Sequence, residues 1–287
     1  MPLCRGIGVP EYVEPDVKKL SHGRKSWVAA AVTAAALTAS GSVAMAGTAS
    51  AAVTLPPLAA AWDYQIGGAY TPPSGVKIVS RDNSDSAASG QYNICYINAF
   101  QINPGLDGEW SGDLLLRDAN GNKVVDPDWK ETLLDIRTAD KRTRVAAKIN
   151  GIIDSCAGKG FQAIEPDNYD SYSRSKNLIS TTQAQDYIKL LSSHAHAKGL
   201  AIAQKNTSDL AGNRSANGLD FAVVEECGHY TECDAYTGPF GNRVVDVEYT
   251  NSGLSKACAS WQGKISIVQR DEGVVPAGGG GYVRRTC

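Results

Sequence analysis

Residues 160–168 read GFQAIEPDN, a short apolar run that ends in polar side chains. A run of this length without alternation is typical of a parallel strand buried on both faces, and we predict a strand over Phe161–Glu165. Six further runs have the same form, and two are weaker. The six are Val76–Ser80, Asn93–Asn98, Leu200–Gln204, Phe221–Glu225, Val244–Glu248 and Lys264–Gln269, and the weaker ones are Trp62–Ile66 and Leu133–Ile136.

Segments with helical spacing lie between these runs. Lys141–Gly158 and Thr182–Lys198 each place apolar side chains on one face, and Gly199 ends the second. Strands that alternate with helices indicate a parallel sheet, and about eight such units indicate a closed (β/α)8 barrel, or TIM barrel. We therefore predict one α/β barrel domain over residues 62–287. The Asn120-Gly121 pair within Arg117–Val125 predicts a hairpin turn inserted in a long loop.

The first 51 residues have the features of a secretory signal peptide. Basic residues precede the Ala-rich apolar run Trp27–Ala39, and Ala49-Ser50-Ala51 fits the small-x-small pattern before a cleavage point. The apolar run is shorter than the ~20 residues that span a bilayer. An Ala-rich helix of the folded domain or a retained anchor are the alternatives. We expect a signal peptide over 1–51, a short linker over 52–61, and a secreted protein without a membrane span after cleavage.

Cysteine usage agrees with export. One of the seven cysteines, Cys4, lies in the leader, and an even number behind a signal peptide indicates disulfides in an oxidising compartment. Six cysteines allow 15 pairings. We expect Cys227–Cys233 to staple a loop, Cys258–Cys287 to hold the C-terminus, and Cys95–Cys156 to be the remaining pair. No C-x-x-C pair is present, so a zinc site of that kind is not expected.

The charge balance argues against several partner classes. The formal net charge is −2, and because five basic and three acidic residues lie in the leader, the mature chain carries −4. Nucleic acid is therefore not an expected partner, while a cationic or neutral ligand is suitable. We expect the protein to be a monomer. His194 and His196 are two apart on a helix and do not share a face, so no metal site is predicted. Neither a Gly-rich phosphate loop nor a G-x-S-x-G motif occurs, and no cofactor is expected.

The predicted strands end in polar or ionisable residues, and in a barrel these ends converge on the mouth that holds the active site. Glycosidic hydrolysis needs one carboxylic acid to protonate the leaving oxygen and a second carboxylate as nucleophile or base. Asp167 and Glu225 follow different strands and could face each other across a cleft. The alternative is that one or both only form ion pairs with Lys205 or Arg270.

The stretch Gly160–Tyr172, GFQAIEPDNYDSY, resembles the signature of the endo-α-1,4-polygalactosaminidase family of glycoside hydrolases. Three blocks follow in the order of that family. They are Gly199-Leu200 with Lys205-Asn206, then Asp220-Phe221 through Glu225-Glu226-Cys227 with Tyr230 and Glu232-Cys233, and then Val244–Tyr249. Upstream, Trp62, Gln65-Ile66 and Cys95-Tyr96 match its opening strands. The resemblance spans about residues 62–250.

The resemblance implies a (β/α)8 fold and cleavage of internal α-1,4 bonds in galactosamine-containing polysaccharide. We expect a retaining mechanism, which a carboxyl separation of about 5–5.5 Å would support and one of about 6.5–9.5 Å would contradict. Carried over by position, it places the catalytic pair at Asp167, as nucleophile, and Glu225, as general acid/base. The residues in its blocks that we expect to bind substrate are Tyr96, Asn168, Asp170, Tyr172, Lys205, Glu226, Glu248 and Tyr249. The other hypotheses are a catalytically silent polysaccharide-binding barrel and an α-glycosidase on another polymer.

One departure from the pattern concerns Glu226, which occupies the usual position of a Gln. If Glu226 and Glu225 both point inward, repulsion would raise the proton affinity of one of them, as a general acid requires. The added negative charge would also favour a substrate with free ammonium groups.

Overall fold

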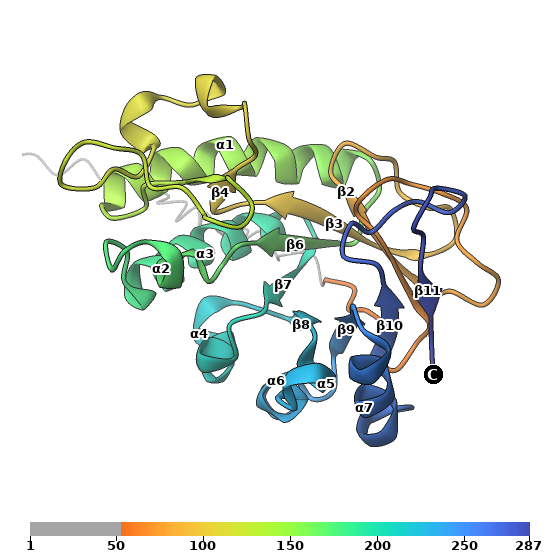
Figure 1. Cartoon of the computed structure of the whole chain (residues 1–287). Coiled ribbons are helices and arrows are strands. Elements are labelled where there is room, and N and C mark those ends of the chain that lie inside the picture. Colours follow the sequence, from red (N-terminus) through yellow and green to blue (C-terminus); the bar gives the residue numbers. More distant parts are fainter. Residues whose placement is uncertain (1–52) are drawn as a thin grey trace, which may run out of the picture. The chain divides into compact units, whose positions relative to one another are not determined.

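The computed structural model describes residues 53–287 (Figure 1), so the expected signal peptide over 1–51 lies outside the described residues. Eight parallel strands follow one another in sheet order, and a short antiparallel strand ends the sheet. The eight are β1 (Trp62–Gln65), β2 (Ile78–Asp82), β3 (Tyr92–Asn98), β6 (Ala163–Asp167), β7 (Ala201–Lys205), β8 (Phe221–Glu225), β9 (Val244–Glu248) and β10 (Ser266–Arg270). The predicted TIM-barrel architecture is confirmed.

The barrel is completed by the C-terminal segment. Among the described residues, β1 and β10 form no ladder with each other. Instead β11 (Arg284–Arg285) pairs antiparallel with β10. The Arg284 guanidinium donates to the Asp63 carboxylate (3.0 Å) and to the carbonyl of Trp62 (3.2 Å), both on β1. Arg284 therefore links the last strand to the first.

Helices cover the outside of the strands, as Figure 1 shows for α1, α3 and α7. No helix joins β1 to β2 or β2 to β3. The longest helices are α1 (Ala139–Gly158) and α3 (Thr181–Ala197), both predicted, and Ser180 caps α3 with a reciprocal bond to Gln183. The others are α2 (Ser171–Arg174), α4 (Arg214–Asn217), α5 (Cys227–Tyr230), α6 (Cys233–Phe240) and α7 (Asn251–Trp261), with 3-10 turns η1 (Asp107–Glu109), η2 (Gly112–Leu114) and η3 (Ser208–Asn213).

The strand residues alternate between two apolar cores, one inside the barrel and one between the strands and the helices. One cluster contains a side chain from each of the eight strands and fills the barrel, with Trp62, Tyr64 and Phe221 as its largest fully buried members. The other cluster joins the outward side chains of the strands to the helices. Because successive residues point to opposite faces, the inward set on each strand fixes which strand-end residues reach the mouth.

The segment between β3 and α1 differs from the expectation. The predicted strand Leu133–Ile136 is not a barrel strand. Thr132–Leu133 forms β5, which pairs antiparallel with β4 (Gln101–Ile102) in a separate two-stranded sheet. The hairpin predicted at Asn120-Gly121 is present, closed by a bridge between Arg117 and Lys123.

The three expected disulfides, Cys95–Cys156, Cys227–Cys233 and Cys258–Cys287, are all formed. Within the expected linker, Val53 and Leu55 pack against the barrel core, and the Tyr92 hydroxyl donates to the carbonyl of Thr54. None of the helices in residues 53–287 has the length and hydropathy needed to cross a membrane.

Candidate active site

Alternation along the strands brings six polar side chains into the mouth of the barrel. On β6, Ala163 belongs to the inner core, so Glu165 and Asp167, two and four residues later, also point inward. The same reasoning applies to Lys205 on β7 and Glu225 on β8. Tyr64 and Tyr96 complete the set from β1 and β3.

Lys205 lies at the centre of this set. Its ammonium is 3.1 Å from Glu165 Oε1, 3.3 Å from Asp167 Oδ1 and 3.7 Å from Glu225 Oε2. The side chain is only 2% exposed, so these carboxylates replace water as its partners. Burial opposes the charged form, but the charges of Asp167, Glu225 and Glu165 hold the pKa of Lys205 well above its usual value. The site therefore contains a permanent buried cation between two strand-end carboxylates.

Asp167 is held in its ionised form. Burial would raise its pKa, but the Lys205 charge, a hydrogen bond from the Tyr96 hydroxyl (2.6 Å) and the backbone N–H of Asn168 (2.8 Å) together keep the pKa below its usual value. The carboxylate remains 18% exposed, so it can meet a ligand. An ionised, partly accessible carboxylate fits a nucleophile or an electrostatic stabiliser.

Glu225 is more accessible, with 30% of its side chain exposed. Its Oε2 accepts from the Asn206 amide (2.9 Å), and its Oε1 accepts from the Tyr249 hydroxyl. The side-chain amide oxygen of Asn206, Oδ1, in turn accepts from the Glu225 backbone N–H (2.9 Å). Asn206 and Tyr249 thus fix the orientation of a carboxyl group that faces solvent.

Glu165 differs from both, because it has no exposed surface. Its Oε1 accepts from the Tyr64 hydroxyl (2.8 Å) as well as from Lys205. Burial, partly offset by the Lys205 charge, raises the pKa of Glu165 to about 7. Glu165 therefore anchors Lys205 and does not reach a ligand.

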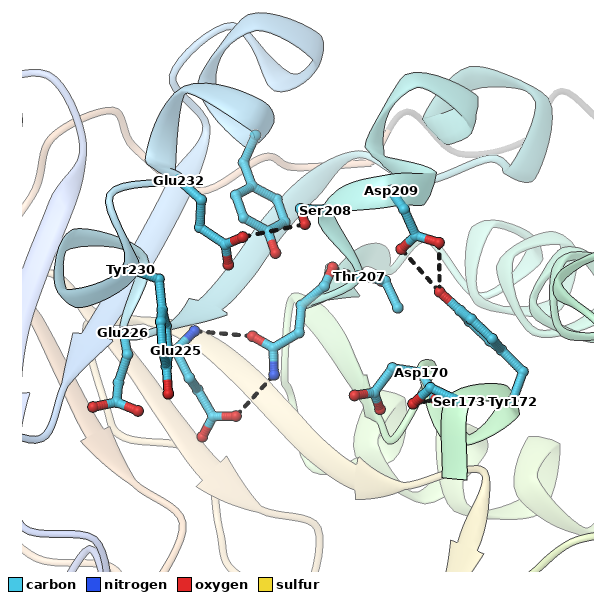
Figure 2. Close-up of a pocket in the computed structure, with 12 residues that line it drawn as sticks. Asp170, Tyr172, Ser173, Thr207, Ser208, Asp209, Glu225, Glu226, Tyr230 and Glu232 are labelled. Carbon is cyan, nitrogen blue, oxygen red and sulfur yellow. Dashed lines mark hydrogen bonds between the residues drawn. The ribbon is translucent and has the colours of Figure 1, made fainter. Parts of the chain in front are cut away.

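A pocket of about 420 Å³ opens beside Glu225 above the loops that follow β6, β7 and β8. Figure 2 shows Glu226, Tyr230 and Glu232 on one side of it, and Asp170, Tyr172, Ser173 and Asp209 on the other. Its lining contains five carboxylates and no Lys or Arg side chain: Asp170, Asp209, Glu225, Glu226 and Glu232. The pocket is therefore acidic.

The remaining expected substrate-binding residues divide into two groups. Asp170 and Tyr172 line the pocket, where Asp170 pairs with Arg174 (2.7 Å) and the Tyr172 hydroxyl donates to Asp209 (2.9 Å). Glu226 also lines it, at a left-handed backbone position (φ 58°). Asn168 does not line the pocket. Its side chain bonds to Asn98, Glu131 and Arg174.

Glu248 is not on the wall of the pocket, contrary to the expectation. Tyr249 follows it and reaches Glu225, so the preceding residue on the strand points outward. Glu248 is fully buried there and accepts from the backbone N–H groups of Gly228 (2.7 Å) and His229 (3.3 Å) on α5. It has no exposed surface with which to bind a sugar.

A cluster of Cys and Asp side chains has the composition of a metal site. In the described part of the chain, one group of potential ligand atoms comes together, on Cys227, Cys233 and Asp246. The two sulfur atoms of this group form a disulfide, so they are not thiolate ligands.

Several functional residues were not selected from the sequence. Asn206 follows Lys205 and orients Glu225 through two hydrogen bonds. Asp209 lies in η3, Tyr230 ends α5 and Glu232 precedes α6, and these segments are too short for periodicity to mark direction. The usable signals were the family blocks, which contain Asn206, Tyr230 and Glu232, and the strand alternation by which Tyr64 shares the inward parity of Trp62.

Comparisons with known proteins show the family and the fold of this chain. The model of glycoside-hydrolase family GH114 matches residues 42–287. The structure of Ega3 from Aspergillus fumigatus in complex with galactosamine is 23% identical, with a TM-score of 0.67, covering 84% of this chain and 100% of that one. The glycoside hydrolase domain of PelA from Pseudomonas aeruginosa is 12% identical, with a TM-score of 0.52, covering 78% and 96%. No curated protein gives a significant match.

Proposed function

The chain belongs to glycoside-hydrolase family GH114, and from this we propose that it cleaves internal α-1,4-galactosaminidic bonds in a galactosamine-containing polysaccharide. The observation that carries the proposal is the placement of Asp167 and Glu225 on either side of the Lys205 ammonium, beside an acidic pocket. Two carboxyl groups that flank a scissile bond are the minimal equipment for glycoside hydrolysis.

A retaining mechanism is favoured by distance. Asp167 Oδ1 and Glu225 Oε2 lie 3.3 and 3.7 Å from the same nitrogen, so these oxygens are at most about 7 Å apart. Carboxyl groups about 5–5.5 Å apart are typical of retaining enzymes, whereas inverting enzymes need about 6.5–9.5 Å to admit a water molecule. The geometry accommodates the retaining separation fully and only the lower end of the inverting range.

The proposed first step is attack of Asp167 on the anomeric carbon, while Glu225 transfers its proton to the leaving glycosidic oxygen. The bond from the anomeric carbon to that oxygen breaks, and a glycosyl ester of Asp167 forms. In the second step Glu225, now a carboxylate, takes a proton from water. The resulting hydroxide attacks the anomeric carbon and releases Asp167.

The negative charge of the acidic pocket supports a cationic substrate. Within the acidic pocket Asp209, Glu226 and Glu232 form no ion pair with Lys, Arg or His in the described residues. Polymers of free galactosamine carry ammonium groups that can supply the missing positive charge. Ega3, a structural relative, was solved with galactosamine bound. These observations favour a de-N-acetylated galactosamine polymer over a neutral glycan.

We also propose that the protein is secreted and acts as a monomer outside the cell. Three disulfides support an oxidising compartment, because such bonds are rare in reducing cytosol. The signal peptide expected over residues 1–51 would direct the export.

The test is release of oligosaccharides from de-N-acetylated α-1,4-linked galactosamine polymer, with product anomers followed by NMR. Asp167→Asn and Glu225→Gln should each fold and lose activity by 10³-fold or more. Asp154→Asn, which changes an exposed carboxylate on α1, should remain fully active. Binding without cleavage by the wild type would favour the polysaccharide-binding alternative, and cleavage of only a different polymer would refute the substrate. An initial product of inverted configuration would refute the retaining step.

A further inference from the structure

Two buried carboxyl groups lie behind the acidic pocket, on the outward face of β9. Asp246 and Glu248 are both fully buried, and neither forms an ion pair with Lys, Arg or His in the described residues. Asp246 Oδ2 and Glu248 Oε2 are buried oxygens with no donor. A single proton shared between the two side chains would provide that donor, because a protonated carboxyl can donate to a carboxylate.

The other oxygens of this pair hold α5. Asp246 Oδ1 accepts from the backbone N–H of Cys227 (3.3 Å), and Glu248 Oε1 accepts from those of Gly228 and His229. These are the first N–H groups of a four-residue helix, which otherwise have no partner. The Cys227–Cys233 disulfide closes the same loop. The loop therefore rests on the carboxyl pair and is closed by the disulfide.

The loop forms one wall of the proposed substrate site. Figure 2 shows Glu226, Tyr230 and Glu232 on the left of the pocket, and all three lie within residues 226–232, which make up this loop. Glu225 is the residue immediately before it. Any displacement of α5 would thus move the wall, while Asp167 and Lys205 are held separately by β6 and β7.

Two glycines leave room for the Glu248 carboxylate. A methyl group at Gly253 on α7 would lie 2.0 Å from Glu248 Oε2, and one at Gly228 would lie 2.6 Å from Ala257 Cβ on α7 and 2.7 Å from Glu248 Oε1. Neither glycine has a positive φ, so close approach requires them: to Glu248 at Gly253, and to both Glu248 and Ala257 at Gly228. Both α5 and α7 are thus fitted around this carboxylate.

We propose that Asp246 and Glu248 are positioning residues for the substrate, and that the single proton between them keeps the 226–232 wall in its binding position. The inference rests on the function proposed above, because the wall is assigned to substrate binding. The pair acts on the polymer only through the loop and does not touch the reacting atoms.

The charge state follows from burial and from mutual repulsion. Burial and the Glu248 charge raise the pKa of Asp246 well above its usual value, and burial also raises the pKa of Glu248. The nearby ionisable groups on packed elements are Glu226 before α5, His229 on α5, and Lys256 on α7, whose ammonium is bound to the His229 carbonyl (3.0 Å). Only Glu226 adds to the repulsion. When the pH rises through the raised pKa, two buried negative charges face each other and the wall loosens.

The test compares the wild type with Asp246→Asn. Asparagine keeps the acceptor for Cys227 and a donor toward Glu248 but has no proton to lose. The polymer amines also lose charge at alkaline pH, which affects both proteins equally, so the readout is the ratio of their KM values. We expect wild-type KM to rise at least fivefold relative to the variant between pH 7 and pH 9.5, with kcat unchanged by the substitution. Equal KM values across this range would overturn the proposal.

Amide hydrogen exchange of the peptide 226–233 gives a readout that needs no substrate. We expect exchange, corrected for intrinsic rates, to accelerate at alkaline pH in the wild type and not in Asp246→Asn. Parallel exchange in the two proteins would refute the proposal, even if the polymer proved to be the wrong substrate. A wild type that fails to cleave the polymer but shows the exchange difference would refute the proposed function alone.

Gly253→Ala gives a second perturbation that changes no charge and serves if Asp246→Asn does not fold. It pushes on Glu248 and should raise KM severalfold at every pH, with faster exchange in 226–233. Gly151→Ala is the matched control, because that glycine also lies in a helix and has open space around its Cβ position. An unchanged KM in Gly253→Ala would count against the proposed role of Glu248.

Discussion

Lys205→Met removes the one cation that joins the three carboxylates of the mouth. Methionine has a similar length and no charge, so the change isolates electrostatics from packing. Because the ammonium lowers the pKa of Asp167, its loss should raise that pKa. A raised pKa means that Asp167 takes up a proton at a higher pH and can no longer act there as the proposed nucleophile. The acid limb of the pH profile should therefore move toward neutral pH.

The magnitude follows from the distance. Unit charges 3.3 Å apart interact by about 5 kcal/mol at an effective dielectric constant of ~20, which corresponds to about 3.7 pKa units. This is an upper limit, because Tyr96 and the Asn168 N–H still stabilise the carboxylate and water can enter. A cation beside an aspartate typically changes its pKa by about 1–3 units, and we expect a shift in that range. Leaving carboxylates buried without their counter-ion should also cost about 3–5 kcal/mol of unfolding free energy.

The assay is kcat/KM for polymer cleavage from pH 3 to pH 9, alongside chemical denaturation. Lys198→Met is the control, because Lys198 is 40% exposed and pairs with Asp154 at the end of α3. The control should leave the pH profile unchanged and cost less than about 1 kcal/mol. A folded Lys205→Met protein whose acid limb coincides with that of the wild type would refute the electrostatic role of this lysine.

Three further predictions follow from the same structure. Glu165→Gln should gain stability over the wild type as the pH rises from about 4.5 to 7, by at most about 3 kcal/mol, because the raised pKa makes ionisation of Glu165 costly in the folded state. Denaturation at a series of pH values would measure this gain, and a difference in unfolding free energy that does not change with pH would contradict it. Tyr96→Phe should move the acid limb of kcat/KM to higher pH and lower the plateau of kcat/KM by about 10–100-fold, because a hydrogen bond to a charged group is worth about 1.5–3 kcal/mol. An unchanged pH profile would argue against this contact. Replacing each disulfide by serines should cost about 4, 3.5 and 2 kcal/mol, from loop lengths of 61, 29 and 6 residues, with thermal unfolding expected to give the order Cys95–Cys156, Cys258–Cys287, Cys227–Cys233.

The barrel was predictable because its strands are continuous apolar runs and its main helices have clear caps and spacing. The convergence of Asp167 and Glu225 was predictable for a related reason, because carboxylates at the ends of two buried strands meet at one mouth. Their catalytic roles stay a prediction. The strand predicted over Leu133–Ile136 was wrong as a barrel strand, because a short apolar run fits an antiparallel hairpin equally well. Periodicity alone does not distinguish the two.

The prediction that Glu248 binds substrate was wrong for a reason that could have been seen in the sequence. Strand-end residues alternate between the mouth and the helix layer, and only one parity can reach a ligand. Val247 is apolar and inward, so Tyr249 must be inward and Glu248 outward. Asp209 and Glu232 could not be located in this way, because they lie outside the strands, in η3 and just before α6, where side-chain direction depends on tertiary contacts with Tyr172 and Ser208.

Under the proposed function, the inward-pointing and outward-pointing residues of the strands have different roles. Inward residues hold Asp167 ionised through Lys205, so their titration should affect kcat/KM at acid pH through the proposed nucleophile. Outward residues hold the pocket wall through Asp246, so their titration should affect KM and at alkaline pH. Because the two sets share no direct hydrogen bond in the described residues, a Tyr96→Phe, Asp246→Asn double variant should combine the single effects additively.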